Sequence, residues 1–406
     1  MSHMVIIGGG VAGGTAAAAL RREGFEGEVT LIAAEPHPPH QRPPLSKGFL
    51  AGDEDLDAVL LHRGDWYADR GIQLRTGVAA TGLDPAARTV ALADGTTLAY
   101  DAVLLATGAS PRSLPIPGAD LPGVHTLRRI EDSEALAAAL RGGDKRLVVI
   151  GSGWIGMEVA ATARGFGNTV TVIGRDAVPL ANAVGTRFGE MFRDVHLAHG
   201  VDVRTRAHVE RITGTDRADG VVVDGETVPA DLVLIGVGAT PNTALAEAAG
   251  LRLSDGIHVD SGLHTSAPGV FAAGDVANPY HPVIQRHLRS EHWANALGTG
   301  KVAAKSMLGR AARFDEIPYF FTDQYDLGME LSGYPPLMTD ADLVVRGDVD
   351  AREFIAFWVD GGRVVGGMNV NIWDVNKDVQ ALIRSGARID AARLADPAVP
   401  LADLAA

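Results

Sequence analysis

Two glycine-rich turns of the same form, 143 positions apart, have the clearest chemistry in this chain. The first runs Gly8-Gly9-Gly10-Val11-Ala12-Gly13 and the second runs Gly151-Ser152-Gly153-Trp154-Ile155-Gly156. In a G-x-G-x-x-G turn the first glycine permits a tight turn and the second lets the backbone approach a pyrophosphate. The third lets the following helix pack closely on the strand. Two such turns predict that the chain binds two dinucleotides. Binding two of them is most useful if electrons pass from one dinucleotide to the other.

Each turn requires a strand before it and a helix after it. Residues 4–33 and residues 146–173 both read as β-α-β units. Each half also contains a later apolar strand that ends on glycine, at residues 103–108 and 231–238. The repeated order indicates an internal duplication.

The remaining chain predicts a third domain. From about residue 317 we expect antiparallel strands at 327–332, 343–346, 353–359 and 363–368, with a closing helix at 375–384. Before them we expect a rigid, extended proline-rich connector at 36–47 and a helix at 290–307. The predicted class is α/β, with one dinucleotide-binding domain at 1–110 and 240–316, a second at 111–239 and an α+β domain at 317–406.

Composition excludes several classes of function. Among 406 residues there is no cysteine, which excludes a disulfide, a thiolate metal site and a cysteine-ligated iron–sulfur cluster. His, Asp and Glu show no compact metal-ligand spacing, so we expect no metal. A net charge of −14 argues against nucleic acid and anionic membranes as partners. No apolar run reaches the roughly 18 residues that span a bilayer, and we expect a soluble cytoplasmic protein.

Six motifs together resemble the FAD-dependent ferredoxin reductases, such as putidaredoxin reductase and the reductase components of aromatic-ring dioxygenases. Beside the two turns they are Arg42-Pro43-Pro44-Leu45-Ser46-Lys47, Ala106-Thr107-Gly108, Ala272-Ala273-Gly274-Asp275 and Glu291-His292-Trp293-Ala294-Asn295. Segments 321–326 and 367–371 of the third domain are similar to the same family. The likeness covers nearly the whole chain and implies a glutathione-reductase-like fold whose third domain is an interface domain that covers the flavin.

The resemblance implies FAD on the first turn and a nicotinamide nucleotide on the second. Lys47 and Glu158 are the expected catalytic pair, because a cation beside the flavin would stabilise negative charge on its reduced form. The residues expected at FAD are Gly8, Gly10, Val11, Ala12, Gly13, Glu35, Arg42, Pro44, Lys47, Ala80, Thr107, Gly108, Arg128, Asp275, Val276 and Trp293. Those expected at the nicotinamide nucleotide are Gly151, Gly153, Trp154, Ile155, Gly156, Glu158, Gly174, Arg175, Val237 and Gly238.

Asp275 also has a role that the residues themselves predict. A carboxylate at the tip of a strand, after a glycine, can accept hydrogen bonds from the ribityl hydroxyls of FAD. Two positions depart from the family pattern. Ala33-Ala34 stands where relatives carry the acid for the adenosine ribose, and we expect Glu35 to replace it. Phe320-Phe321 stands where relatives often carry tryptophan, so an aromatic ring is retained.

The second β-α-β unit also predicts which nucleotide is used. NADH-binding units usually have an acid at the end of the second strand, which bonds the ribose hydroxyls and repels a 2′-phosphate. Here that strand ends at Gly174-Arg175. The repelling charge is absent and a guanidinium follows, so we expect NADPH, with relaxed use of NADH as the alternative.

The predicted activity is hydride transfer from NAD(P)H to FAD, then single-electron transfer to a small iron–sulfur ferredoxin that serves a cytochrome P450 or a ring-hydroxylating oxygenase. A flavin suits this role because it exchanges both one and two electrons. The alternatives are an NAD(P)H oxidase or quinone reductase and a redox-sensing flavoprotein of the apoptosis-inducing-factor kind. We expect a monomer or weak dimer, and a basic docking site for ferredoxin drawn from Arg286, Arg289, Lys301, Arg310 and Arg313.

Overall fold

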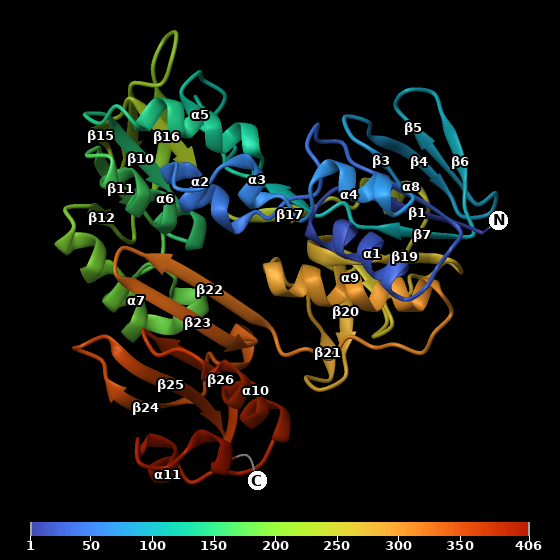
Figure 1. Ribbon diagram of the computed structural model, residues 1–406. Helices are drawn as coiled ribbons and strands as arrows, with labels where there is room; N and C mark the ends of the chain where they lie inside the picture. The colour runs from blue at the N-terminus through green and yellow to red at the C-terminus, as the bar shows by residue number, and fades with distance from the viewer. Residues whose placement is uncertain (1, 405–406) are drawn as a thin grey trace. The chain divides into compact units, whose positions relative to one another are not determined.

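The computed structural model describes residues 2–404, which divide into two compact units (Figure 1). The first unit consists of the chain up to Arg42 with Asp55–Ser110 and Ala239–Pro318. The second consists of Pro43–Glu54, Pro111–Gly238 and the chain from Tyr319 onward. Each unit is therefore assembled from three separate stretches of sequence.

A five-stranded parallel sheet is the centre of the first unit. Its order is β19-β7-β1-β2-β3, and β1 pairs with β2 in a register that sets Ile7 opposite Ile32. The strands are β1 (His3–Ile7), β2 (Glu28–Ile32), β3 (Ile72–Arg75), β7 (Ala102–Leu105) and β19 (Val270–Ala272). Most side chains of β1, β2, β7 and β19 are buried, as expected of parallel strands covered on both faces, whereas the edge strand β3 is more exposed.

Helices α1 (Val11–Arg22) and α9 (Trp293–Met307) pack closely in this unit. The contact depends on Gly300, because a Cβ there would lie 2.6 Å from the carbonyl oxygen of Ala12. Helix α9 begins at Trp293, so the predicted start at residue 290 is wrong. The preceding residues, including Arg289, are tied into loop hydrogen bonds instead.

Smaller elements complete the first unit. They are α3 (Leu56–Val59), α4 (Gly64–Asp69), α8 (Ala244–Ala248), the sheet β4 (Ala80–Asp84), β5 (Thr89–Leu92) and β6 (Thr97–Ala99), the sheet β18 (Ile257–Val259), β20 (Ala277–His281) and β21 (Arg286–His287), and the paired strands β8 (Ala109–Pro111) and β17 (Ala239–Pro241). A hairpin turn at Asp94-Gly95 joins β5 and β6.

The second unit repeats the parallel arrangement, with the order β12-β11-β10-β16-β9. The strands are β9 (Val124–His125), β10 (Arg146–Ile150), β11 (Thr169–Ile173), β12 (Asp202–Arg204) and β16 (Leu232–Ile235), and the helices are α5 (Ile130–Leu140), α6 (Trp154–Gly165) and α7 (Ala181–Ala198). Antiparallel strands β13 (Val209–Thr213), β14 (Gly220–Val223) and β15 (Glu226–Pro229) form a side sheet.

The C-terminal part of this unit is an antiparallel sheet, orange to red in Figure 1. Its order is β22-β23-β26-β25-β24, and the strands are β22 (Tyr319–Gln324), β23 (Leu327–Gly333), β24 (Asp342–Asp348), β25 (Glu353–Asp360) and β26 (Arg363–Val370). Helices α10 (Asn376–Ser385) and α11 (Ala391–Ala395) follow. The four predicted strands are present within a few residues, whereas β22 was missed. The predicted fold class, with two Rossmann-like sheets and a C-terminal α+β domain, is confirmed.

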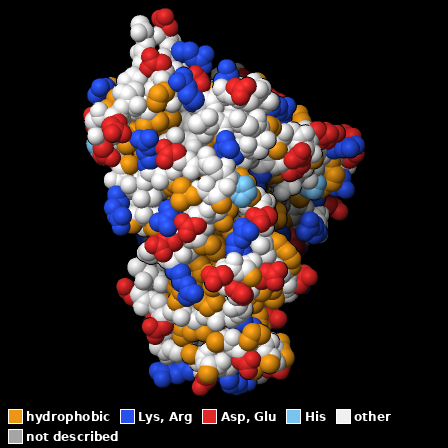
Figure 2. Space-filling view, turned by 90° about the vertical axis from the view of Figure 1, so that its left-hand side faces the viewer, with side chains coloured by type: hydrophobic (Ala, Val, Ile, Leu, Met, Phe, Trp, Pro, Cys, Tyr) orange, Lys and Arg blue, Asp and Glu red, His pale blue; other side chains and the backbone are white. Residues whose placement is uncertain are grey.

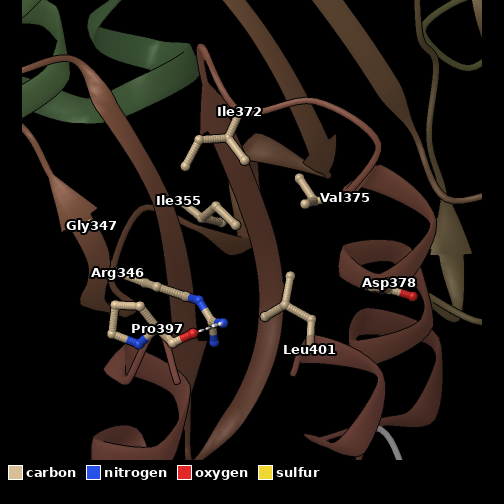
Figure 3. A pocket seen from close by; sticks show the side chains of 8 residues that line it. All are labelled: Arg346, Gly347, Ile355, Ile372, Val375, Asp378, Pro397 and Leu401. Carbon is tan, nitrogen blue, oxygen red and sulfur yellow. Dashed lines mark hydrogen bonds between the residues drawn. The ribbon is translucent and has the colours of Figure 1, made fainter. Parts of the chain in front are cut away.

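A hollow in this C-terminal part lies between β24, α10 and the end of the chain, and Figure 3 shows its lining. Arg346 donates from Nη2 to the carbonyl oxygens of Pro397 (3.1 Å) and Val399 (2.7 Å). These bonds fasten the last segment to the sheet, so this guanidinium has a structural use.

The proline-rich segment is not the extended connector that we predicted. Pro43–Ser46 forms a 3-10 turn and Gly48–Ala51 a short helix, α2. Two hydroxyls of the second unit hold the turn: Ser133 donates to the carbonyl oxygen of Leu45 (2.8 Å), and Thr162 donates to that of Ser46 (3.0 Å). Between residues 2 and 404, no helix is long and apolar enough to cross a bilayer.

Candidate functional site

The three motif glycines of the first turn, at positions 8, 10 and 13, have different surroundings. Gly8 has a φ of +127°, and a Cβ there would lie 2.0 Å from the carbonyl oxygen of Ala106. A Cβ on Gly13 would lie 2.0 Å from the carbonyl oxygen of Gly8. A Cβ on Gly10 would meet nothing within 4 Å. The protein's own packing thus requires glycine at positions 8 and 13, whereas the space beside Gly10 is free for a ligand.

The second turn repeats this pattern. Gly151 has a φ of +116° and would clash with the carbonyl oxygen of Gly236, and Gly156 would clash with that of Gly151. A Cβ on Gly153 would again meet nothing within 4 Å. Helices α1 and α6 also begin without a side-chain cap and without an acid in the first turn. Their first N–H groups can therefore bind an anion, which fits a pyrophosphate at each turn.

The acid expected at the adenosine ribose lies near the first turn. Glu35 accepts a hydrogen bond from Nη2 of Arg42 at 2.6 Å, and its second carboxylate oxygen lies 3.6 Å from Nε2 of His40. Burial lowers the pKa of His40, which favours a neutral ring there. Ala33 packs against Gly9, where a Cβ would lie 2.4 Å away, so the end of β2 has little room for a larger side chain.

Asp275 lies at the end of β19, within a short 3-10 turn that also contains the buried Val276. Asp275 is only 8% exposed. Gly274 has a φ of +75°, and its N–H donates to the hydroxyl of Thr299 on α9. Trp293 is the first residue of that helix. The first unit therefore brings its glycine turn, Asp275 and α9 together.

Lys47 and Glu158, the expected catalytic pair, are in contact. Nζ of Lys47 lies 3.2 Å from Oε1 of Glu158, and their side chains are 16% and 6% exposed. The hydroxyl of Thr322 donates to the same oxygen at 2.6 Å, and Ser46 donates to Oε2 through a short hydrogen bond. Nζ of Lys47 also lies 4.8 Å from the centre of the Phe321 ring, within range of a cation–π contact.

Ser46 and Thr322 are functional candidates that the sequence analysis did not name as site residues, although both lie in segments that resemble the family, 42–47 and 321–326. The sequence did not predict that either hydroxyl binds Glu158. Thr322 lies on β22, 164 positions along the chain from Glu158. An isolated hydroxyl in a strand is a weak signal, because serine and threonine are common in every kind of element. Only the pairing of β22 with β23 and its packing on α6 bring the hydroxyl to the carboxylate.

Aromatic rings surround the start of α6. The ring of Trp154 packs on Phe320 with centroids 4.4 Å apart and meets the edge of Phe192 at 5.9 Å. Ile155 is 44% exposed. An exposed apolar side chain and a stacked indole at the N-terminus of the helix provide an apolar wall beside the second turn.

The end of β11 shows why an acid is missing there. A Cβ on Gly174 would lie 2.4 Å from Oγ and 3.0 Å from Cβ of Ser152, the second residue of the turn. The Arg175 side chain is 87% exposed and forms a loose ion pair with Asp176 at 3.8 Å. The guanidinium is thus free to move toward an anion, and Ser152 occupies the space that a side chain at 174 would take.

The remaining predicted residues fall into two groups. In the first unit, Thr107 and Asn242 exchange two hydrogen bonds (2.7 and 2.9 Å) next to Gly108, and Ala80 begins β4. In the second unit, Pro44 lies in the 3-10 turn, Arg128 precedes α5, and Val237 and Gly238 follow β16.

The expected basic docking residues are mostly engaged in ion pairs within the first unit. Arg289 is only 13% exposed. Three of the five candidates contact carboxylates: Arg289 with Asp255 and Glu291, Arg310 with Glu23, and Arg313 with Asp315. Arg286 and Lys301 are exposed. On the face drawn in Figure 2, acidic and basic side chains are interspersed and form no region of one sign.

Comparison with known proteins agrees with this geometry. A family model described as pyridine nucleotide-disulphide oxidoreductase matches residues 2–300, and one described as reductase C-terminal matches residues 319–405. The chain belongs to the pyridine nucleotide-disulphide oxidoreductase family. Because it contains no cysteine, it has no redox disulfide of its own.

Individual relatives narrow the class. The probable ferredoxin reductase CtmF from Castellaniella defragrans is 40% identical over 369 residues, 89% of each chain. The ferredoxin–NAD(+) reductase component of the anthranilate 1,2-dioxygenase system of Burkholderia cepacia is 36% identical over 407 residues, 98% of each chain. The crystal structure of the covalent putidaredoxin reductase–putidaredoxin complex matches with a TM-score of 0.95 and 34% identity, over 99% of this chain and 98% of that one. The predicted membership of the ferredoxin reductases, an oxidoreductase class that uses FAD and NAD(P)H, is confirmed.

Proposed function

We propose that the protein takes a hydride from NADPH onto FAD and passes the electrons singly to an iron–sulfur ferredoxin that serves a cytochrome P450 or a ring-hydroxylating oxygenase. The observation that carries this proposal is the space beside Gly10 and Gly153, one in each unit, where nothing in the protein requires glycine. FAD would bind the first turn and the nicotinamide nucleotide the second. When bound, the flavin supplies the exchange between two-electron and one-electron chemistry.

The side chains of the protein would bind, orient and provide charge. In the first unit, Asp275 would accept hydrogen bonds from ribityl hydroxyls, and Glu35 with Arg42 would bind the adenosine end. In the second unit, Lys47 would hold a positive charge where negative charge develops on reduction. Glu158 would keep that ammonium in place, since it contacts Nζ at 3.2 Å.

The ferredoxin partner is inferred from relatives. One matching structure is a complex of putidaredoxin reductase with putidaredoxin, and one relative is named as part of a dioxygenase system. The shared C-terminal domain over residues 319–405 supports the same kind of partner for this chain.

The NADPH preference rests on the end of β11. Gly174 offers no carboxylate to bond a ribose 2′-hydroxyl or repel a 2′-phosphate, and the exposed Arg175 can turn toward one. Arginine suits a phosphate because its planar fork makes charge-assisted, often bidentate hydrogen bonds.

The test is a stopped-flow and steady-state assay on the purified FAD protein. We expect rapid bleaching of the flavin with NADPH and ferredoxin-dependent reduction of cytochrome c. Slow reduction by both nucleotides would refute the hydride step. Fast reduction without any ferredoxin-dependent rate, across several [2Fe–2S] ferredoxins, would refute the electron-transfer step.

A further inference from the structure

A chain of buried hydrogen bonds leads away from Glu158 through the second unit. Thr322 donates to Oε1 of Glu158 at 2.6 Å, and Nε2 of Gln324 lies 3.2 Å from the hydroxyl of Thr322. Oε1 of Gln324 lies 2.8 Å from Nε2 of His196, and the hydroxyl of Tyr325 lies 3.5 Å from Nδ1 of the same ring. The chain joins α6, β22 and α7.

The direction of each bond in this chain is inferred from the Lys47–Glu158 ion pair at its inner end. An ionised carboxylate only accepts, so Thr322 must give its one proton to Glu158. Its oxygen then accepts from the amide N–H of Gln324, which leaves Oε1 of Gln324 to accept from His196. His196 is therefore the Nε2–H tautomer, with Nδ1 as an acceptor for Tyr325. All four donors point toward Glu158, and aligned hydrogen bonds polarise one another.

The surroundings of the chain favour this arrangement. Thr322 and His196 are fully buried and Gln324 is 1% exposed. Burial lowers the pKa of His196 to about 4, so the ring is neutral at physiological pH and Nδ1 is available. At its outer end, the Tyr325 ring stacks on His199 with centroids 3.7 Å apart.

We propose that Gln324 and His196 are positioning residues that hold the hydroxyl of Thr322 on Glu158 and thereby fix this carboxylate against Lys47. The proposal rests on the proposed function, because the pair matters only if Lys47 acts on bound flavin. The groups that face Glu158 are Lys47 and Ser46 from the proline-rich segment and Thr322 from β22. The titratable groups farther along the chain are His196, Tyr325 and His199, and the charge of Arg164 acts on Tyr325.

The first variant is Gln324→Leu, which keeps the volume and removes both bonds. We expect flavin reduction at saturating NADPH to slow about tenfold, the equivalent of one buried hydrogen bond, with little change in NADPH Kd. The midpoint potential of bound FAD, measured by xanthine oxidase titration without nicotinamide nucleotide, should shift. Gln380→Leu is the matched control, since Gln380 donates to Ser332 and Asn376 in the C-terminal part, away from Glu158.

Two further variants separate positioning from damage to the fold. Thr322→Val removes the last hydroxyl, and Thr322→Val combined with Gln324→Leu should be no slower than Thr322→Val alone, because both break one chain. Gln324→Glu should approach the wild-type rate only at low pH, where its protonated carboxyl can donate to Thr322 as the amide does, and its rate should fall about tenfold as that carboxyl ionises.

Each result decides the proposal. A Gln324→Leu rate within twofold of wild type, multiplicative loss in the double variant, or the same pH profile for Gln324→Glu and Gln324→Leu would overturn it. A wild-type protein that neither nucleotide reduces would defeat the proposed function instead, while the potential shift would still report on the chain.

Discussion

Gly174→Glu tests the nucleotide preference and the packing behind it. In both β-α-β units the second residue of the glycine turn packs against the residue that follows the second strand, and one residue of each pair is glycine. In the first, Gly9 of the turn makes room for the Cβ of Ala33; in the second, Gly174 makes room for the side chain of Ser152. Each pair has space for only one Cβ. A glutamate at position 174 therefore requires the backbone or the side chain of Ser152 to shift.

The distances give the magnitudes. A Cβ at 2.4 Å from Oγ and 3.0 Å from Cβ of Ser152 is overpacked, and such insertions cost about 1–3 kcal/mol of stability. A carboxylate at this position would also repel a 2′-phosphate by several kcal/mol, so NADPH affinity should fall at least about 100-fold. A gain of about 10- to 150-fold for NADH, from bonds to the ribose hydroxyls, should appear only when Ser152→Gly is added.

The assay is a double-mutant cycle over Ser152→Gly and Gly174→Glu, with Kd for both nucleotides and the unfolding midpoint measured for each protein. We expect the double variant to be more stable than Gly174→Glu and to prefer NADH. Arg175→Ala is the comparison, and because Arg175 is 87% exposed we expect only about a fivefold loss of NADPH affinity. Additive effects of the two substitutions, or wild-type preference for NADH, would refute the reasoning.

Four further outcomes are expected. Gly10→Val should give a colourless protein, because the valine side chain would fill the space beside the turn in which the pyrophosphate of FAD is proposed to bind; full FAD absorbance would contradict this. Lys47→Ala should slow flavin reduction in stopped flow more than it weakens nucleotide binding, and unchanged reduction kinetics would remove Lys47 from the site. Ferredoxin-dependent rates should fall with ionic strength while NADPH reduction changes less, and a salt-independent rate would count against electrostatic docking. The hydrogen bond from Arg146 lowers the pKa of Asp231 to about 2, so the stability that this pair adds is present above pH 4 and lost between pH 4 and 2; Asp231→Asn should remove that part of the acid unfolding curve.

The sequence predicted the parts of the fold that depend on local pattern. The two glycine turns lie between strand and helix as expected, because the first and third glycine of each G-x-G-x-x-G turn are required by close contacts with carbonyl oxygens of their own unit. The antiparallel strands of the third domain were found because the alternation of apolar and polar residues along each strand is a local signal. Strand β22 was not predicted because Tyr319–Gln324 shows little alternation of apolar and polar residues and the loop before it has no turn signal.

The parts that escaped prediction depend on long-range contacts. The proline-rich segment forms a 3-10 turn because Ser133 and Thr162, both far along the chain, bind its carbonyl groups. The partners of Glu158 come from positions 46 and 322, so no single stretch contains the cluster. The resemblance to the family predicted Lys47 and Glu158. The hydroxyls that bind Glu158 could be identified only in the structure.

The division of each unit into three stretches has a consequence for biosynthesis. As the chain leaves the ribosome, the first parallel sheet lacks its edge strand until Val270–Ala272 has been made, so β7 remains an open edge. The carboxylate of Glu158 likewise waits for Thr322. Neither unit can therefore be completed in the order of translation, and a fragment that stops at residue 239 should aggregate rather than fold as an independent domain.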